Sequence, residues 1–163
     1  MEKILVSACL MGECVRYNGV TRRFKSHVLD AWHRQGRIVA ICPEVAGGLP
    51  VPRARSEIRE GGGIEVLNGH TRVVNINGED VTHHFLEGAR KALELARALE
   101  IRVAVLKEGS PSCGSGYIHD GSFTGVKKPG NGVAAALLEE SGIRVFSERE
   151  IAEADNYIKT LII

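Results

Sequence analysis

Short apolar runs, separated by polar segments that contain glycine, recur along this chain. KILVS at residues 3–7 and RIVAIC at residues 37–42 are rich in aliphatic and β-branched side chains. Each run is too short for a helix and is apolar on both faces, which is typical of a strand buried inside a sheet. On this pattern the sequence predicts four buried strands, at residues 3–7, 37–42, 102–106 and 143–146.

A second pattern, with apolar residues three or four positions apart, predicts helices between those strands. Residues 83–99 keep this helical spacing, and Thr82 before them belongs to the residue types that cap helices. Ser147 and Glu150 have the spacing of a capping box, which indicates that a last helix begins there. We expect helices at residues 24–34, 83–99, 133–140 and 148–159.

Glycine and proline mark the connections between these elements. Residues 43–63 hold three prolines and five glycines, and we expect them to form a long loop without regular structure. Residues 71–81 are expected to form a β-hairpin around Asn77-Gly78, a dipeptide that favours tight turns. Residues 107–130 are rich in glycine and serine and are expected to form a second long loop.

Strands that alternate with helices, and that are apolar on both faces, indicate a parallel sheet covered by helices. We therefore expect an open, mainly parallel, Rossmann-like α/β sheet with helices on both faces and one small β-hairpin. No internal repeat or linker composition interrupts the pattern, so residues 1–163 are expected to form a single domain.

The charge balance narrows the choice of partners. The 163 residues are 44% hydrophobic and 25% charged with a net charge of +1, the proportions of an ordinary globular protein. Basic residues are scattered and only 5% of residues are aromatic, so we expect a small-molecule ligand and no nucleic acid. No stretch reaches the ~20 apolar residues of a membrane span, and the N-terminus lacks the basic start of a signal peptide. A cytoplasmic protein without membrane contacts is expected, and the oligomeric state is left open.

Three of the four cysteines follow predicted strands. Cys9 lies two residues after the first strand, Cys42 ends the second and Cys113 follows the third. Ligands of open α/β sheets bind at the carboxyl ends of the strands, so we expect these thiols to meet at one edge. Such a set fits an iron–sulfur cluster, a zinc site that also uses Cys14, or a single nucleophilic cysteine without a metal. Structural disulfides are not expected in a reducing cytoplasm.

Polar residues are expected at the same edge of the sheet. Glu44, which follows the second strand, is a carboxylate that can exchange protons there. The loop KEGSPSCGSG brings Lys107, which can neutralise negative charge, and the hydroxyl groups of Ser110 and Ser112. Two further cations, which can clamp a polar group of a substrate, are Arg53 and Arg55.

Four motifs resemble those of a known family: SACLMGECVRYNG, CPEVAGGLPVPR, GEDVTHHFLEGA and LKEGSPSCGSGYIHDGSFTG. With them the chain resembles the thiouracil desulfurase (desulfidase) family, long described as a domain of unknown function. The resemblance extends over nearly the whole chain. Asn18 is a departure, because the family commonly has Asp in an RYDG motif, so a charge is missing at that loop.

The resemblance implies an oxygen-sensitive 4Fe–4S cluster held by Cys9, Cys42 and Cys113, whose fourth iron binds the sulfur of the substrate. It also implies a non-redox desulfidation, in which water replaces the sulfur of a thiolated base such as 2- or 4-thiouracil and hydrosulfide is released. The residues that match the family's acid/base carboxylate and the polar helpers around it are Glu44, Lys107, Ser110 and Ser112.

Overall fold

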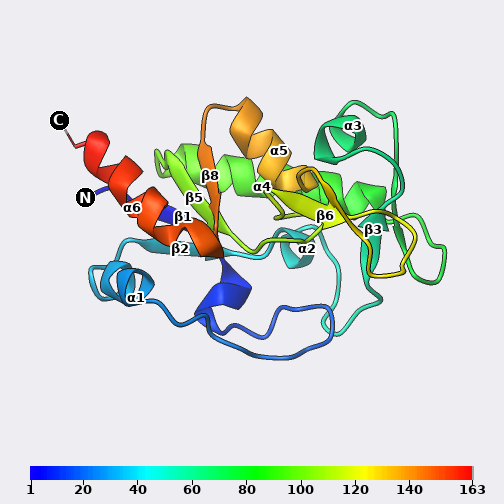
Figure 1. Cartoon of the computed structure of the whole chain (residues 1–163), viewed down its shortest axis with the longest axis horizontal. Coiled ribbons are helices and arrows are strands. Elements are labelled where there is room, and N and C mark those ends of the chain that lie inside the picture. The colour runs from blue at the N-terminus through cyan, green and yellow to red at the C-terminus, as the bar shows by residue number, and fades with distance from the viewer. Residues whose placement is uncertain (163) are drawn as a thin grey trace.

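The computed structural model describes residues 1–162, and its central sheet has the strand order β2-β1-β5-β8 (Figure 1). All three pairings within this sheet are parallel, so the expected mainly parallel sheet is confirmed. The strand order reverses beside β1, and ligand sites of open α/β sheets form at the carboxyl ends of the strands at such a point. The bounds are β1 (Ile4–Ser7), β2 (Ile38–Ile41), β5 (Val103–Leu106) and β8 (Arg144–Ser147).

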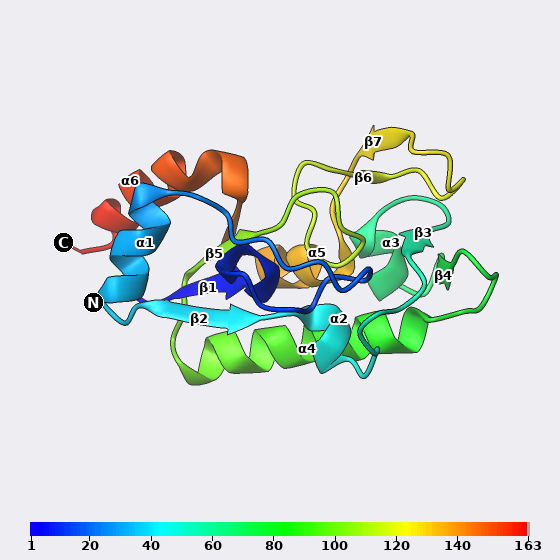
Figure 2. The ribbon, with the colours of Figure 1, turned by 90° about the horizontal axis from the view of Figure 1, so that it is seen from below.

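Helices cover both faces of this sheet, as the sequence predicts (Figure 2). Residues of β1 alternate between the faces: Ile4 and Val6 pack in one apolar cluster with Trp32, whereas Leu5 packs in a second with Leu93. This burial on both sides explains why the strands are apolar throughout. The first cluster is covered by α1 (His27–Arg34) and α6 (Ile151–Thr160), and the second by α4 (Thr82–Ala98) and α5 (Val133–Glu140).

The two predicted helix caps have different outcomes. The capping box at Ser147 and Glu150 is confirmed, and it begins a 3₁₀ turn, η2 (Glu148–Glu150), that leads into α6. Thr82 is the first residue of α4 and does not cap it; its Oγ1 instead accepts the N–H of Val73, at 2.9 Å. Within residues 1–162, no helix combines the length and the apolar character needed to cross a membrane.

The prediction of a long irregular loop at residues 43–63 is wrong. A one-turn helix, α2 (Pro43–Ala46), begins there at a proline, a residue that suits the first turn of a helix. Further along, β3 (Ser56–Ile58) forms an antiparallel pair with β4 (Val73–Asn75), a partner distant in sequence. Together with α3 (Gly63–Leu67), this pair encloses a third apolar cluster that includes Ile58, Val73, Phe85 and Ile118.

The hairpin predicted at residues 71–81 forms only in part. Its turn is present, with Gly78 at a φ of 82°, but the second arm adds only one isolated bridge because β4 pairs mainly with β3. The loop predicted at residues 107–130 instead contains a short antiparallel hairpin of β6 (Tyr117–His119) and β7 (Lys127–Pro129). Both corrections involve strands of three residues, which carry little periodicity of their own.

Candidate functional site

Three cysteines lie together where β1, β2 and β5 end. Cys9 belongs to η1 (Ala8–Met11), the 3₁₀ turn after β1, and Cys42 is the N-cap of α2 directly after β2. Cys113 lies in the turn that follows β5. All three line one cavity of about 450 Å³. Because β2, β1 and β5 are neighbours in the sheet, the thiols meet at one edge as predicted.

Burial dominates the chemistry of these thiols. It raises the pKa of Cys9 and of Cys42, and it raises the pKa of Cys113 to about 12. Arg16, beside Cys9, acts in the opposite direction, because a cation favours the thiolate. None of the three is in a disulfide. A cofactor that brings positive charge and prefers soft sulfur ligands fits this donor set, and an iron–sulfur cluster meets both conditions.

Cys14 lies apart from the three cavity thiols. Its side chain is exposed, its Sγ donates a hydrogen bond to the Gly19 carbonyl at 3.3 Å, and it is outside the cavity lining. Among residues 1–162, no three Cys, His, Asp or Glu side chains are close enough to share a single metal ion. Cys14 is therefore not placed to complete a zinc site with the three cavity thiols.

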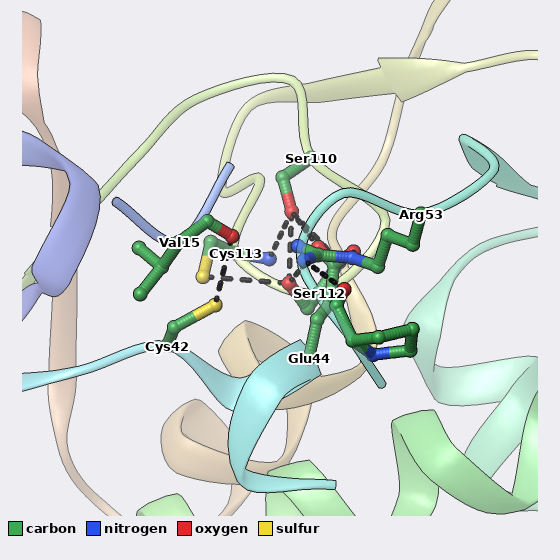
Figure 3. Close-up of polar contacts among 8 residues, drawn as sticks. Val15, Cys42, Glu44, Arg53, Ser110, Ser112 and Cys113 are labelled. Atoms are coloured by element: carbon green, nitrogen blue, oxygen red, sulfur yellow. Dashed lines mark hydrogen bonds and ion pairs between the residues drawn. The ribbon is translucent and has the colours of Figure 1, made fainter. Parts of the chain in front are cut away.

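Glu44 is held beside the thiols by side chains from two other segments (Figure 3). Its Oε2 accepts hydrogen bonds from Ser112 Oγ at 2.9 Å and from Ser110 Oγ at 3.4 Å. Its Oε1 lies 3.2 Å from Nε of Arg53, and the side chains of this ion pair are only 14% and 6% exposed. Ser112 Oγ is also 3.5 Å from Cys113 Sγ. One hydroxyl group thus connects the carboxylate to a cavity thiol.

Ser110 orders the turn that carries Cys113. Its Oγ accepts the backbone N–H groups of Ser112 at 3.0 Å and of Cys113 at 3.1 Å. Serine side chains commonly stabilise turns through such local bonds to the backbone. The same hydroxyl therefore fixes the Cys113 backbone and contacts the Glu44 carboxylate, so the structure brings together three residues that the sequence singled out separately.

Glu108 organises the same loop, although no motif or pattern in the sequence indicates this role. Its Oε1 accepts the backbone N–H groups of Ser115 at 2.8 Å, Gly116 at 3.0 Å and Tyr117 at 3.3 Å. Burial acts to raise the pKa of this carboxyl, but the N–H groups together hold the pKa below its ordinary value. The carboxylate thereby joins the end of β5 to the start of β6, with Cys113 in the segment between them.

Lys107 lines the cavity but is also part of an ion pair. Its Nζ lies 2.8 Å from Glu148 Oε2, and Glu148 Oε1 accepts the backbone N–H of Glu108 at 2.8 Å. The Glu148 side chain is only 5% exposed. Lys107 is therefore not a free cation at the site, because a buried carboxylate balances part of its charge. Sequence alone placed Glu148 in a helix start and gave no indication of this contact.

Arg55 and Asn18 line the same cavity. Arg55 Nη2 donates to the Phe123 carbonyl at 3.1 Å, and the guanidinium lies over the Phe123 ring. Asn18 Oδ1 accepts the Val20 N–H at 3.0 Å, so the amide makes a local turn bond of the kind that an aspartate also makes. Four further residues belong to the site or support it without any signal in the sequence pattern: Arg16, Glu57, Glu108 and Glu148.

This chain is similar to known proteins over most of its length. A sequence model of the 2-thiouracil desulfurase family matches residues 4–150. The uncharacterized protein YbbK of Bacillus subtilis (strain 168) is 46% identical over 152 residues, which is 91% of this chain and 97% of that protein. The solved structure of the 4Fe–4S-dependent thiouracil desulfidase TudS (DUF523Vcz) is similar with a TM-score of 0.90 and 49% sequence identity, covering 98% of this chain and 99% of that one. The chain belongs to the 2-thiouracil desulfurase family.

Proposed function

We propose that this protein is a 4Fe–4S-dependent desulfidase that converts a thiolated base of the thiouracil type into its oxo form. In this hydrolysis the C=S bond is replaced by C=O, water supplies the oxygen, and the sulfur leaves as hydrosulfide with release of one proton. No electrons are gained or lost. The observation that carries the proposal is the convergence of three thiols and a hydrogen-bonded carboxylate on one cavity, in a member of this family.

The three cavity thiols are proposed to hold the cluster. When bound, a cluster with three protein thiolates keeps one iron open as a Lewis acid that polarises a thiocarbonyl group. The chain itself contributes placement, because each thiol sits on a short segment at the end of a buried strand. Arg16 and Lys107 both act to lower the pKa of Cys9, although burial outweighs them, so they offset negative charge near the ligands. The proposed ligands are Cys9, Cys42 and Cys113.

Glu44 is proposed to move the protons of the reaction. A positioned carboxylate can accept a proton from the attacking water and pass one to the leaving sulfur. Arg53 fixes Oε1, while the hydroxyls of Ser110 and Ser112 orient Oε2. These supports come from two different loops, so the carboxylate is fixed by contacts from outside its own helix.

A metal-free reaction with a cysteine nucleophile is less well supported. The nucleophile is the thiolate, so such an enzyme needs a thiol whose pKa is lowered. Burial instead raises the pKa of Cys9, Cys42 and Cys113. A bound metal displaces the protons of its thiol ligands. The raised pKa of these thiols is therefore compatible with roles as metal ligands, and it makes metal binding depend on pH.

The experiment that tests this function is anaerobic reconstitution with iron and sulfide, followed by incubation with 2-thiouracil and 4-thiouracil. Uracil and hydrosulfide are expected in equal amounts from the reconstituted protein and not from the iron-free protein. Equal turnover by the iron-free protein would contradict the proposal.

A further inference from the structure

Glu57 of β3 is a buried carboxylate that the reaction described above does not use. Only 4% of the residue is exposed, and it lines the same cavity as the three thiols. Carboxylates are rarely buried unless hydrogen bonds or opposite charges satisfy them. The contacts of its two oxygens therefore indicate what the side chain is placed to bind.

The two carboxylate oxygens of Glu57 have different surroundings. Oε1 accepts the backbone N–H groups of Gly121 at 2.9 Å and of Phe123 at 3.2 Å. Oε2 accepts no hydrogen bond from residues 1–162. Every side-chain oxygen or nitrogen in this range that is completely buried does have a hydrogen-bond partner. Oε2 is thus not completely sealed within the protein, and Glu57 is one of the residues that line the cavity.

The loop that binds Oε1 is closely packed, which fixes the direction of the carboxylate. A Cβ atom on Gly121 would lie 2.5 Å from the Arg59 carbonyl oxygen, and the φ of Gly121 is 95°. Arg55 holds the same loop through its hydrogen bond to the Phe123 carbonyl. Because two N–H groups of this loop hold Oε1, the orientation of the carboxylate is fixed, and Oε2 is left available to a further donor.

We infer that Glu57 is a specificity-determining residue whose Oε2 accepts a hydrogen bond from a ring N–H of the thiolated base. The inference rests on the proposed function, since it assigns part of the binding site for that substrate. A thiouracil ring carries two N–H donors, and a carboxylate offers acceptors only. A hydrogen bond to a charged acceptor is stronger than a neutral one, and a buried acceptor without a donor is costly. Glu57 therefore selects rings that present an N–H over rings alkylated at that nitrogen.

Glu57→Gln separates this role from a role in holding the loop. Glutamine keeps a carbonyl oxygen for the Gly121 and Phe123 N–H groups but places an amide NH₂, a donor, where Oε2 stood. For reconstituted enzyme we expect kcat/KM with 2-thiouracil to fall by about 5- to 150-fold. Glu60→Gln makes the same chemical change at an exposed position nearby, and its kcat/KM should match that of the wild type.

Methylated substrates test the hydrogen bond directly. 1-Methyl- and 3-methyl-2-thiouracil each lack one ring N–H, and the wild type should discriminate against at least one of them by about 5- to 150-fold. Glu57→Gln should lose most of that discrimination. Its amide NH₂ is a donor and cannot accept a hydrogen bond from the ring N–H, so removal of this N–H by methylation costs the variant little. Discrimination of equal size in both proteins, or none in the wild type, would overturn the inference.

Binding of uracil to the iron-free protein, measured by titration calorimetry, gives a readout that does not depend on turnover. Uracil has the same ring N–H groups, so the wild type should bind it more tightly than Glu57→Gln by a similar factor. If thiouracil is not turned over while uracil binding still depends on Glu57, only the proposed function fails. If turnover is normal and neither uracil binding nor methyl discrimination depends on Glu57, only the present inference fails.

Discussion

Gly88 of α4 lies directly against the backbone of Pro43 in α2, so that a Cβ atom on Gly88 would come within 1.9 Å of the Pro43 carbonyl oxygen. The contact is reciprocal, because a Cβ on Gly47 would lie equally close to the carbonyl oxygen of His84. His84 Nδ1 also lies 2.8 Å from the Gly47 carbonyl. Since α2 carries Glu44 and has Cys42 at its N-cap, this contact positions one proposed ligand and the proposed acid/base group.

Gly88→Ala should therefore damage the site without destabilising α4 itself. Alanine favours a helix over glycine by about 1 kcal/mol, so loss of helix propensity is not an explanation. Displacement of α2 by about 1 Å is expected to lower kcat/KM by about 100-fold and to reduce iron retention. Iron content, activity and circular dichroism check this, with the exposed Lys91→Ala on the same helix as the control. Wild-type activity in Gly88→Ala would show that α2 is not positioned in this way.

The ligand assignment predicts a difference between the cavity cysteines and Cys14. Separate Cys→Ser changes at positions 9, 42 and 113 should each leave the reconstituted protein without most of its brown iron–sulfur absorbance, because a hydroxyl is a poor substitute for a soft thiolate. Cys14→Ser should keep the full absorbance, since this thiol lies outside the cavity. Normal iron content in any of the three cavity variants would remove that residue from the ligand set.

Glu44→Gln should separate proton transfer from cofactor binding. The amide can still accept the Ser112 hydrogen bond but cannot exchange protons at neutral pH, so kcat should fall by about 100- to 10,000-fold. Iron content and the cluster spectrum should remain those of the wild type. A kcat within a few-fold of the wild type would mean that another group moves the protons.

Glu108→Gln should weaken the loop that presents Cys113, and the effect should depend on pH. The folded pKa of Glu108 lies below its ordinary value, so its carboxylate stabilises the fold above about pH 4.3, and this contribution is lost as the pH falls through the folded pKa. At pH 7 the iron-free variant should lose about 1–2 kcal/mol of unfolding free energy, a modest figure because the group is partly solvated.

The difference between wild type and Glu108→Gln should then shrink in urea titrations between pH 5 and pH 3. Glu140→Gln, at an exposed position, serves as the matched control and should show little difference at any pH. A gap between wild type and Glu108→Gln that stays constant over this range would mean that the charge of Glu108 is not what holds the loop.

The sequence predicts the parallel sheet and the meeting of the three thiols because both follow from local patterns. Buried strands are recognisable as apolar runs, and residues just after neighbouring parallel strands must meet at one edge. Glu44 is predictable for the same reason, since it lies two residues after Cys42.

Elements that depend on distant partners cannot be predicted in this way. Each of β3 and β4 has only three residues and is stabilised by pairing with the other, so neither has a strong pattern of its own. In the sequence, ordinary surface charge is likewise all that can be assigned to Glu57, Glu108 and Glu148. Their roles become visible only in the fold, which brings backbone N–H groups to the first two and a lysine to the third.

The most direct test of the central claim is a single-turnover reaction of the reconstituted enzyme with 2-thiouracil in H₂¹⁸O under anaerobic conditions. Hydrolysis at the three-cysteine site predicts one hydrosulfide per uracil and one ¹⁸O atom in each uracil, with no added reductant or oxidant, and no product from Cys113→Ser treated in the same way. Uracil without ¹⁸O, a requirement for an electron donor, or normal product formation by Cys113→Ser would contradict hydrolysis at a site built on these three cysteines.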